Sequence, residues 1–157
     1  MLTTQLHIKW KKFDVLHLGE FLKVTSNKLV HFEEIYVTIH SILCVDDSPG
    51  DLKLLESTLA EAGYNVTVAR NGKEAVQAAS QTRPDLIFMD VNMPEMDGFQ
   101  ATRTLSGSAE TKMIPVVLVT AKDQKADRVW AQMLGVKGYI TKPYPPQSLL
   151  DIVKAIG

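Results

Sequence analysis

The chain has 157 residues, of which 45% are hydrophobic, and its formal net charge is -1 at pH 7. This length allows one ordinary domain with an additional segment, and the hydrophobic content is sufficient for a core. The near-neutral charge gives no reason to expect nucleic acid or an anionic membrane as a partner. The single cysteine, Cys44, excludes an internal disulfide. Because no apolar stretch reaches the roughly 20 residues of a membrane span and no secretory signal pattern is present, we expect a cytoplasmic protein without a membrane segment.

Residues 1–40 differ from the remainder of the chain. They mix basic, aromatic and acidic residues without a sustained period of two or 3.6. We therefore predict an N-terminal extension over residues 1–40, poorly ordered and of unknown role, and a domain over residues 41–157. Two interpretations of the extension stay open. The native protein starts near Val37, or the extension is a real tail that binds a partner.

From Ser41 onward, strand and helix patterns alternate. Short apolar or alternating runs predict strands over residues 42–45, 65–69, 86–90, 115–120 and 138–141. Helices are predicted with Ser48 as N-cap and Pro49 as first residue, after the Asn71-Gly72 turn, over residues 99–105 and 126–134, and from Pro146 onward. Five strand–helix units in strict alternation predict an α/β fold, a doubly wound five-stranded parallel sheet with helices on both faces. In the fourth helix we expect Trp130 and Met133 to lie in the core or at its edge.

Polar residues stand where four of these strands end. Asp46 and Asp47 follow the first strand and Asp90 ends the third, while Thr120 ends the fourth and Lys142 follows the fifth. In open α/β sheets, ligands and chemistry gather at the carboxyl ends of the strands, so we expect these groups to converge.

Three aspartates at one place repel one another, by about 4 kcal/mol for two unit charges roughly 4 Å apart at an effective dielectric of about 20. One lysine and one divalent cation balance three carboxylates, and a set of oxygen ligands favours Mg²⁺. A metal, a carboxylate nucleophile, a hydroxyl and a lysine are the parts needed for phosphoryl transfer onto an aspartate. Taken singly, each has an ordinary alternative: Asp46 or Asp47 can assist a helix cap, Thr120 can be a plain strand residue, and Lys142 a solvated strand end.

Together the motifs are specific. Asp46-Asp47, Met89-Asp90 followed by Met93-Pro94-Glu95-Met96-Asp97-Gly98, Val119-Thr120-Ala121, and Lys142-Pro143 after Tyr139 resemble a response-regulator receiver domain. The resemblance covers residues 41–157 and implies the flavodoxin-like receiver fold. The run over residues 121–130 is most similar to single-domain, chemotaxis-type receivers, including those that govern twitching pili.

The resemblance implies that Asp90 accepts a phosphoryl group from a histidine kinase. It implies that Asp47 and Asp90 bind Mg²⁺ directly, Asp46 binds it through water, and Asn92 contributes its backbone carbonyl. Lys142 is expected to contact the phosphoryl group.

The resemblance also implies a switch. Thr120 moves its hydroxyl onto a phosphoryl oxygen, and Tyr139 follows inward from an exposed rotamer. An aromatic residue in a strand can also serve packing alone, so the role of Tyr139 stays open. The face made by the fourth helix, the fifth strand and the last helix then changes its affinity for a downstream motility or signalling protein.

Rival functions remain at this point. A phosphate sink or a phosphorylation-independent interaction module fits the same residues. A DNA-binding regulator needs a basic helix-turn-helix after the domain, and a haloacid-type phosphatase needs a carboxylate two residues after the nucleophile, where Asn92 stands. Apart from its own phosphorylation and dephosphorylation, we expect no enzymatic turnover. Two departures from the family pattern, Gly50-Asp51 and Tyr144-Pro145-Pro146, are expected to leave the site groups untouched.

Overall fold

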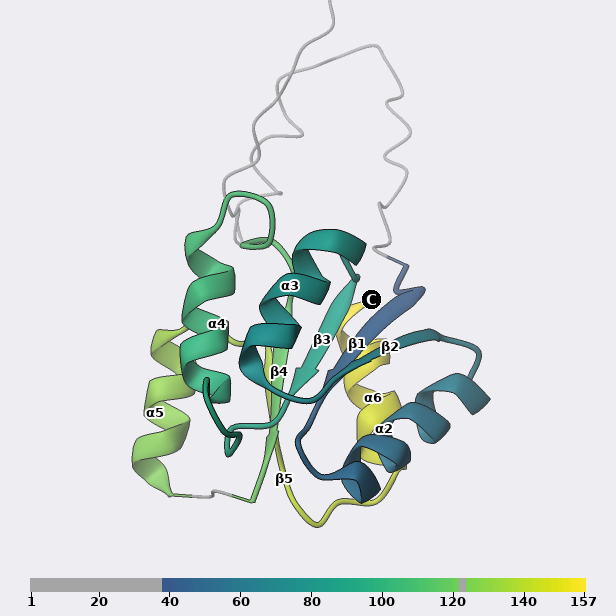
Figure 1. Ribbon diagram of the computed structural model, residues 1–157. Coiled ribbons are helices and arrows are strands. Elements are labelled where there is room, and N and C mark those ends of the chain that lie inside the picture. The colour runs from purple at the N-terminus through teal and green to yellow at the C-terminus, as the bar shows by residue number, and fades with distance from the viewer. Residues whose placement is uncertain (1–37, 122–123) are drawn as a thin grey trace, which may run out of the picture. The chain divides into compact units, whose positions relative to one another are not determined.

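The computed structural model describes residues 38–121 and 124–157, so the predictions for residues 1–37 lie outside it. Figure 1 shows strands and helices in alternation along the chain. The strands are β1 (Ser41–Val45), β2 (Asn65–Ala69), β3 (Leu86–Met89), β4 (Val116–Thr120) and β5 (Gly138–Thr141). The helices are α2 (Pro49–Glu61), α3 (Gly72–Thr82), α4 (Gly98–Gly107), α5 (Lys125–Met133) and α6 (Gln147–Ile156).

The strands form one sheet in the order β2-β1-β3-β4-β5, and every neighbouring pair is parallel. The order reverses direction at β1, which lies between β2 and β3. Such a reversal is the place in a doubly wound sheet where a crevice opens beyond the carboxyl ends of the strands. The predicted fold class is therefore confirmed, and β1 and β3, the strands that lead to the aspartates, lie side by side.

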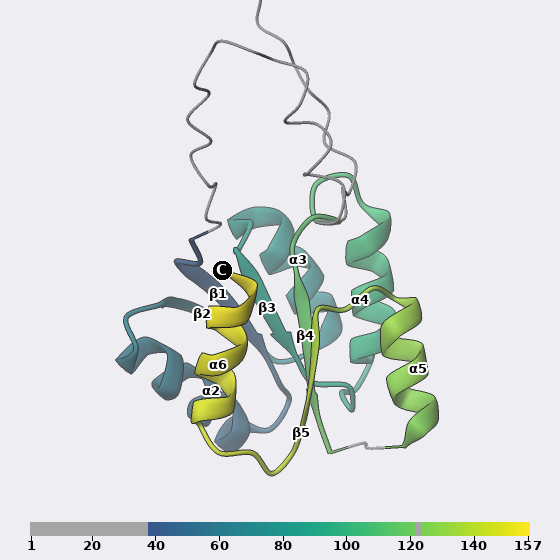
Figure 2. The same ribbon diagram turned by 180° about the vertical axis from the view of Figure 1, so that it is seen from behind.

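Helices cover both faces of the sheet (Figures 1 and 2). The residues of β1 alternate between the faces, because side chains along a strand point to opposite sides. Leu43 and Val45 pack in a cluster with α3, α4 and Ala131 of α5, whereas Ile42 and Cys44 pack in a second cluster with α2 and α6. Burial on both faces accounts for the short continuous apolar runs in the sequence.

Three helices, α2, α3 and α4, have side-chain caps at their N-termini. The side chains of Ser48, Asn71 and Asp97 accept hydrogen bonds from backbone N–H groups in the first turns of α2, α3 and α4. These caps satisfy donors that have no partner within the helix. Ser48 with Pro49 thus starts α2 as predicted, and Asp97 caps the start of α4. None of the helices in the described ranges is long and apolar enough to cross a membrane.

The prediction for Trp130 and Met133 is wrong. Their exposed fractions are 58% and 74%, and the only buried residue of α5 is Ala131. Helical spacing identifies an apolar stripe, but it does not tell whether the stripe faces the core or the solvent. In α5 the small Ala131 faces the sheet, and the large apolar side chains are on the outside.

Candidate functional site

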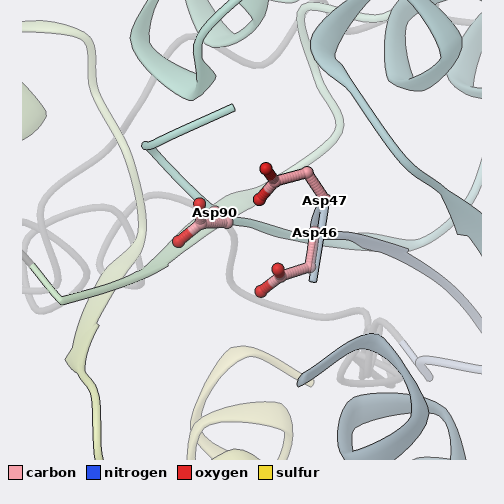
Figure 3. A group of neighbouring side chains, drawn as sticks. All are labelled: Asp46, Asp47 and Asp90. Atoms are coloured by element: carbon pink, nitrogen blue, oxygen red, sulfur yellow. The ribbon is translucent and has the colours of Figure 1, made fainter. Parts of the chain in front are cut away.

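Three carboxylates meet at the carboxyl edge of the central strands. Asp46 and Asp47 follow β1, and Asp90 follows β3. One carboxylate oxygen from each residue lies within 4.8 Å of the other two, and Figure 3 shows the three side chains gathered at this place. Asp46 and Asp90 are buried, whereas Asp47 is exposed. The convergence predicted for the three aspartates is therefore present.

Backbone hydrogen bonds fix where the buried aspartates stand. The N–H of Asp90 donates to the carbonyl oxygen of Val45 at 2.8 Å, and the N–H of Asp46 donates to that of Ala69 at 3.2 Å. Each bond continues the pairing of neighbouring strands beyond the last strand residue. In addition, Oδ1 of Asp46 accepts a hydrogen bond from the N–H of Ser48 at 2.9 Å, which leaves Oδ2 for other partners.

Lys142 joins the group from the end of β5. Its Nζ lies 2.6 Å from Oδ2 of Asp46 and 3.3 Å from Oδ1 of Asp90. The N–H of Lys142 donates to the carbonyl oxygen of Thr120 at 2.9 Å, so the backbone of the lysine is held by the neighbouring strand. The structure thus brings Lys142 to the aspartates, as expected from its place at a strand end.

A fourth carboxylate, Asp51, also contacts the lysine. Its Oδ2 accepts a hydrogen bond from Nζ of Lys142 at 2.9 Å. The expectation that Gly50-Asp51 leaves the site groups untouched is therefore wrong. A signal was present in the sequence. A helix that begins directly after Asp46-Asp47 has to start at the same edge of the sheet, so a carboxylate in its first turn lies close to the site.

The site perturbs the ionisation of two groups. Burial raises the pKa of Asp90, and the negative charge of Asp46 raises it further, whereas Lys142 acts in the opposite direction. For Lys142, burial by itself lowers the pKa, but the hydrogen bonds to Asp46 and Asp51 outweigh it and the pKa is raised. Lys142 is therefore held as a cation, and a buried carboxylate beside other carboxylates gains from any further positive charge.

The remaining predicted residues take different places. Thr120 is fully buried at the end of β4, and Asn92 is exposed in the loop after β3. Tyr139 lies half-buried on β5, with the guanidinium carbon of Arg128 4.8 Å from the centre of its ring. Arg128 also donates a hydrogen bond to Oγ1 of Thr141 at 3.2 Å. This arginine, for which the sequence offered no prediction, links α5 to β5.

The loop that carries Asn92 is fastened at its far end. The N–H of Gly72 donates to the carbonyl oxygen of Met96 at 3.2 Å, and Lys73 forms an ion pair with Glu95 at 2.9 Å. Glu95 has a φ of 65°, in the left-handed region. The start of α3 thus contacts the loop between β3 and α4.

The donor set indicates what this place can hold. The aspartates offer only carboxylate oxygens, and one lysine does not neutralise the three that lie together. Hard divalent cations with oxygen ligands suit such a set, and an exposed Asp47 leaves the site open to solvent on one side.

Comparisons with known proteins agree with this arrangement. Residues 42–154 match the response regulator receiver domain family. Protein PilH of Pseudomonas aeruginosa is 45% identical over 115 residues, which cover 73% of this chain and 95% of that protein. The structure of the chemotaxis protein CheY4 of Vibrio cholerae matches with a TM-score of 0.72 and 31% identity, over 76% of this chain and 99% of that one.

A further solved structure is informative about the acidic site. The receiver domain of the sensor histidine kinase PA1611 of Pseudomonas aeruginosa matches with a TM-score of 0.69 and 32% identity, over 74% of this chain and 95% of that one. In that structure a magnesium ion is coordinated in the active site cleft. Receiver domains are signalling domains of two-component systems that accept phosphoryl groups from histidine kinases and bind downstream targets. The family match over most of the chain and the identity to PilH show that this protein belongs to the response regulator receiver domain family.

Proposed function

We propose that the protein is a response regulator that accepts a phosphoryl group on Asp90 and thereby changes its affinity for a downstream partner. The observation that carries the proposal is the position of Asp90, buried beside Asp46 and Asp47 and within 3.3 Å of the ammonium group of Lys142. Burying several carboxylates around one lysine destabilises the folded state. Such clusters are therefore found mainly at functional sites. A histidine kinase is the proposed phosphoryl donor.

In this proposal Asp46, Asp47 and Asp90 hold Mg²⁺ together with the backbone carbonyl of Asn92, Asp46 through a water molecule. The carboxylate oxygens of the aspartates suit this ion, and the magnesium in the PA1611 receiver domain supports the assignment. When bound, the ion neutralises negative charge on the carboxylates and on the phosphoryl oxygens.

The proposed step is an in-line displacement at phosphorus. A carboxylate oxygen of Asp90 forms the new bond to phosphorus while the bond from phosphorus to the histidine nitrogen of the kinase breaks, and its electron pair leaves with that nitrogen. Lys142 contacts the phosphoryl group and stabilises charge on its oxygens. The only other catalysis in the proposal is hydrolysis of the aspartyl phosphate, in which water attacks phosphorus, the bond to the Asp90 oxygen breaks and inorganic phosphate leaves.

The output follows from the new charge. A phosphoryl group adds about -1.5 to -2 charges and strong acceptor oxygens to the site. We propose that the hydroxyl of Thr120 moves to satisfy one of those oxygens, and that Tyr139 then turns inward from its place beneath Arg128. The face made of α5, β5 and α6 carries the change to a partner, because Tyr139 and Arg128 lie on it.

We further propose that this partner acts in chemotaxis or pilus-driven motility, in the cytoplasm, where kinases and their phosphoryl donors are found. The likeness to the chemotaxis protein CheY4 and the sequence run over residues 121–130 support this assignment.

Acetyl phosphate tests the proposal without knowledge of the kinase. The protein is incubated with it in Mg²⁺ or in EDTA, and the intact mass is measured. We expect one phosphoryl group per chain in Mg²⁺ and none in EDTA, with no adduct in Asp90→Asn. Asp151→Asn, on the exposed side of α6, is the matched control and should behave as the wild type. Absence of an adduct on wild-type protein that still binds Mg²⁺ would favour the phosphorylation-independent interaction module instead.

A further inference from the structure

The ammonium group of Lys142 has three carboxylate neighbours. Its Nζ is 2.6 Å from Asp46, 2.9 Å from Asp51 and 3.3 Å from Asp90. The contacts to Asp46 and Asp51 are hydrogen bonds, and the contact to Asp90 is an ion pair. Of the three carboxylates, the proposed phosphoryl acceptor is the most distant.

We propose that Asp51 is a positioning residue for Lys142 that slows the phosphorylation of Asp90. It draws the ammonium group toward the start of α2 and has to release it before the lysine can bind the phosphoryl group. This inference rests on the proposed function. It concerns how one residue of this chain regulates the phosphorylation of Asp90.

The burial of the carboxylates indicates which of them can release Lys142. The side chain of Asp46 is only 1% exposed, and its other oxygen is held by the N–H of Ser48, so it stays with Lys142 throughout. The side chain of Asp51 is 45% exposed. When the lysine leaves, water can hydrate this carboxylate at small cost, whereas a buried carboxylate has no such replacement. Asp51 is therefore the exchangeable partner.

The charges at the site also indicate that Asp51 slows the phosphorylation of Asp90. Lys142 and one divalent cation balance the three carboxylates of Asp46, Asp47 and Asp90. Asp51 adds a fourth negative charge beside the lysine, at a site that has to receive an anionic phosphoryl group. Both its hold on Lys142 and its repulsion of the incoming group oppose the transition state, in which the lysine stabilises the phosphoryl oxygens.

The test is the initial rate of phosphorylation by acetyl phosphate at saturating Mg²⁺, measured by intact mass for the full chain. Asp51→Asn keeps the size of the side chain and removes its charge. We expect the phosphorylation rate of this variant to be roughly three- to tenfold higher than that of the wild type. This factor corresponds to the free energy of one ion pair that involves a half-exposed carboxylate. Asp151→Asn removes the same charge from α6, where the side chain accepts a hydrogen bond from Gln147, and should leave the rate unchanged.

The Lys142→Gln background separates positioning from a general field effect. Without the lysine only the repulsion of the incoming group remains, so Asp51→Asn should raise the rate there by a smaller factor than in the presence of Lys142. If Lys142→Gln takes up no phosphoryl group, a double-mutant cycle of urea unfolding on the same two positions decides, because absence of coupling between them would overturn the proposal.

The outcomes also separate this inference from the proposed function. If the wild type gains no phosphoryl group, the proposed function fails. If the wild type is phosphorylated but Asp51→Asn reacts at the same rate or more slowly, Asp51 does not restrain the reaction and the inference is overturned. An equal acceleration by Asp51→Asn with and without Lys142 would assign the effect to charge alone and would overturn the positioning role.

Discussion

The backbone carbonyl oxygen of Asp90 fills the space that a Cβ atom on Gly98 would need. A side chain at position 98 would also come within 2.9 Å of the Cα atom of Val91. Gly98 is the first residue of α4, and its N–H donates to the carbonyl oxygen of Val91 at 3.0 Å. The start of this helix and the backbone of the proposed phosphoryl acceptor are thus packed directly on each other.

Gly98→Ala should therefore destabilise the protein and displace Asp90. We expect the free energy of unfolding to fall by at least about 2 kcal/mol, because backbone atoms on both sides have to shift. The measurement is urea unfolding followed by circular dichroism. Gly107→Ala at the other end of α4 is the control, since a Cβ there meets nothing within 4 Å. Equal stability of the two variants would contradict the close packing at Asp90.

Asp85 should give the protein a stability that is lost in acid. Its Oδ2 accepts hydrogen bonds from the N–H groups of His40 and Ser41 and from the hydroxyl of Ser41. Burial alone raises the pKa of Asp85, but these hydrogen bonds outweigh it and hold the pKa below its ordinary value of 3.8. A group with a lowered pKa in the folded state stabilises the fold above its unfolded pKa, and the contribution disappears as the pH falls through the folded pKa.

We therefore expect Asp85→Asn to lower the free energy of unfolding by about 1 kcal/mol at neutral pH. The difference from the wild type should shrink as the pH drops below 3.8. Urea unfolding at a series of pH values measures it, with the exposed Glu61→Gln as control. A difference that stays constant down to the most acidic pH would show that the charge of Asp85 plays no part.

Tyr144 carries a buried hydroxyl group. The oxygen is buried and has no hydrogen-bond partner among the described residues, and burial raises the pKa of the phenol to about 12. A buried polar group without a partner costs about 1–3 kcal/mol. Tyr144→Phe should thus unfold at the same urea concentration as the wild type or at a higher one. A loss of more than about 1 kcal/mol would mean that the hydroxyl is hydrogen-bonded after all.

The exposed apolar side chains of α5 should contribute little to stability. Trp130→Ala is expected to change the free energy of unfolding by less than about 0.5 kcal/mol, as for surface positions in general. Leu59→Ala, at a fully buried position of α2, should cost about 2–5 kcal/mol. Thermal and urea unfolding of the two variants side by side test this contrast. A large loss of stability in Trp130→Ala would place the indole in the core.

The sequence was informative where periodicity and strand ends decide the structure. Continuous apolar runs predicted the buried strands, and polar residues at their ends predicted that Asp46, Asp90 and Lys142 meet. Such predictions succeed because parallel strands in one sheet bring their carboxyl ends to a common edge.

Contacts that depend on the exact start or facing of a helix were not predictable in the same way. Asp51 reaches Lys142 because of how α2 is placed beside the end of β1, and no periodicity encodes that distance. Trp130 and Met133 follow helical spacing but face away from the sheet, since Ala131 fills the contact. A pattern of apolar residues shows which face of a helix is apolar. Whether that face contacts the core or the solvent depends on how the helix packs.

Asp90, among the aspartates at this edge, is the proposed acceptor of the phosphoryl group. The most direct measurement is to phosphorylate the protein with acetyl phosphate in Mg²⁺, reduce it with borohydride, and map the peptides by mass spectrometry. Reduction converts an aspartyl phosphate to homoserine and so marks the residue that carried it. We predict homoserine at position 90 and unmodified aspartate at positions 46, 47 and 51. Homoserine at any of those three positions, with position 90 unchanged, would show that Asp90 is not the acceptor.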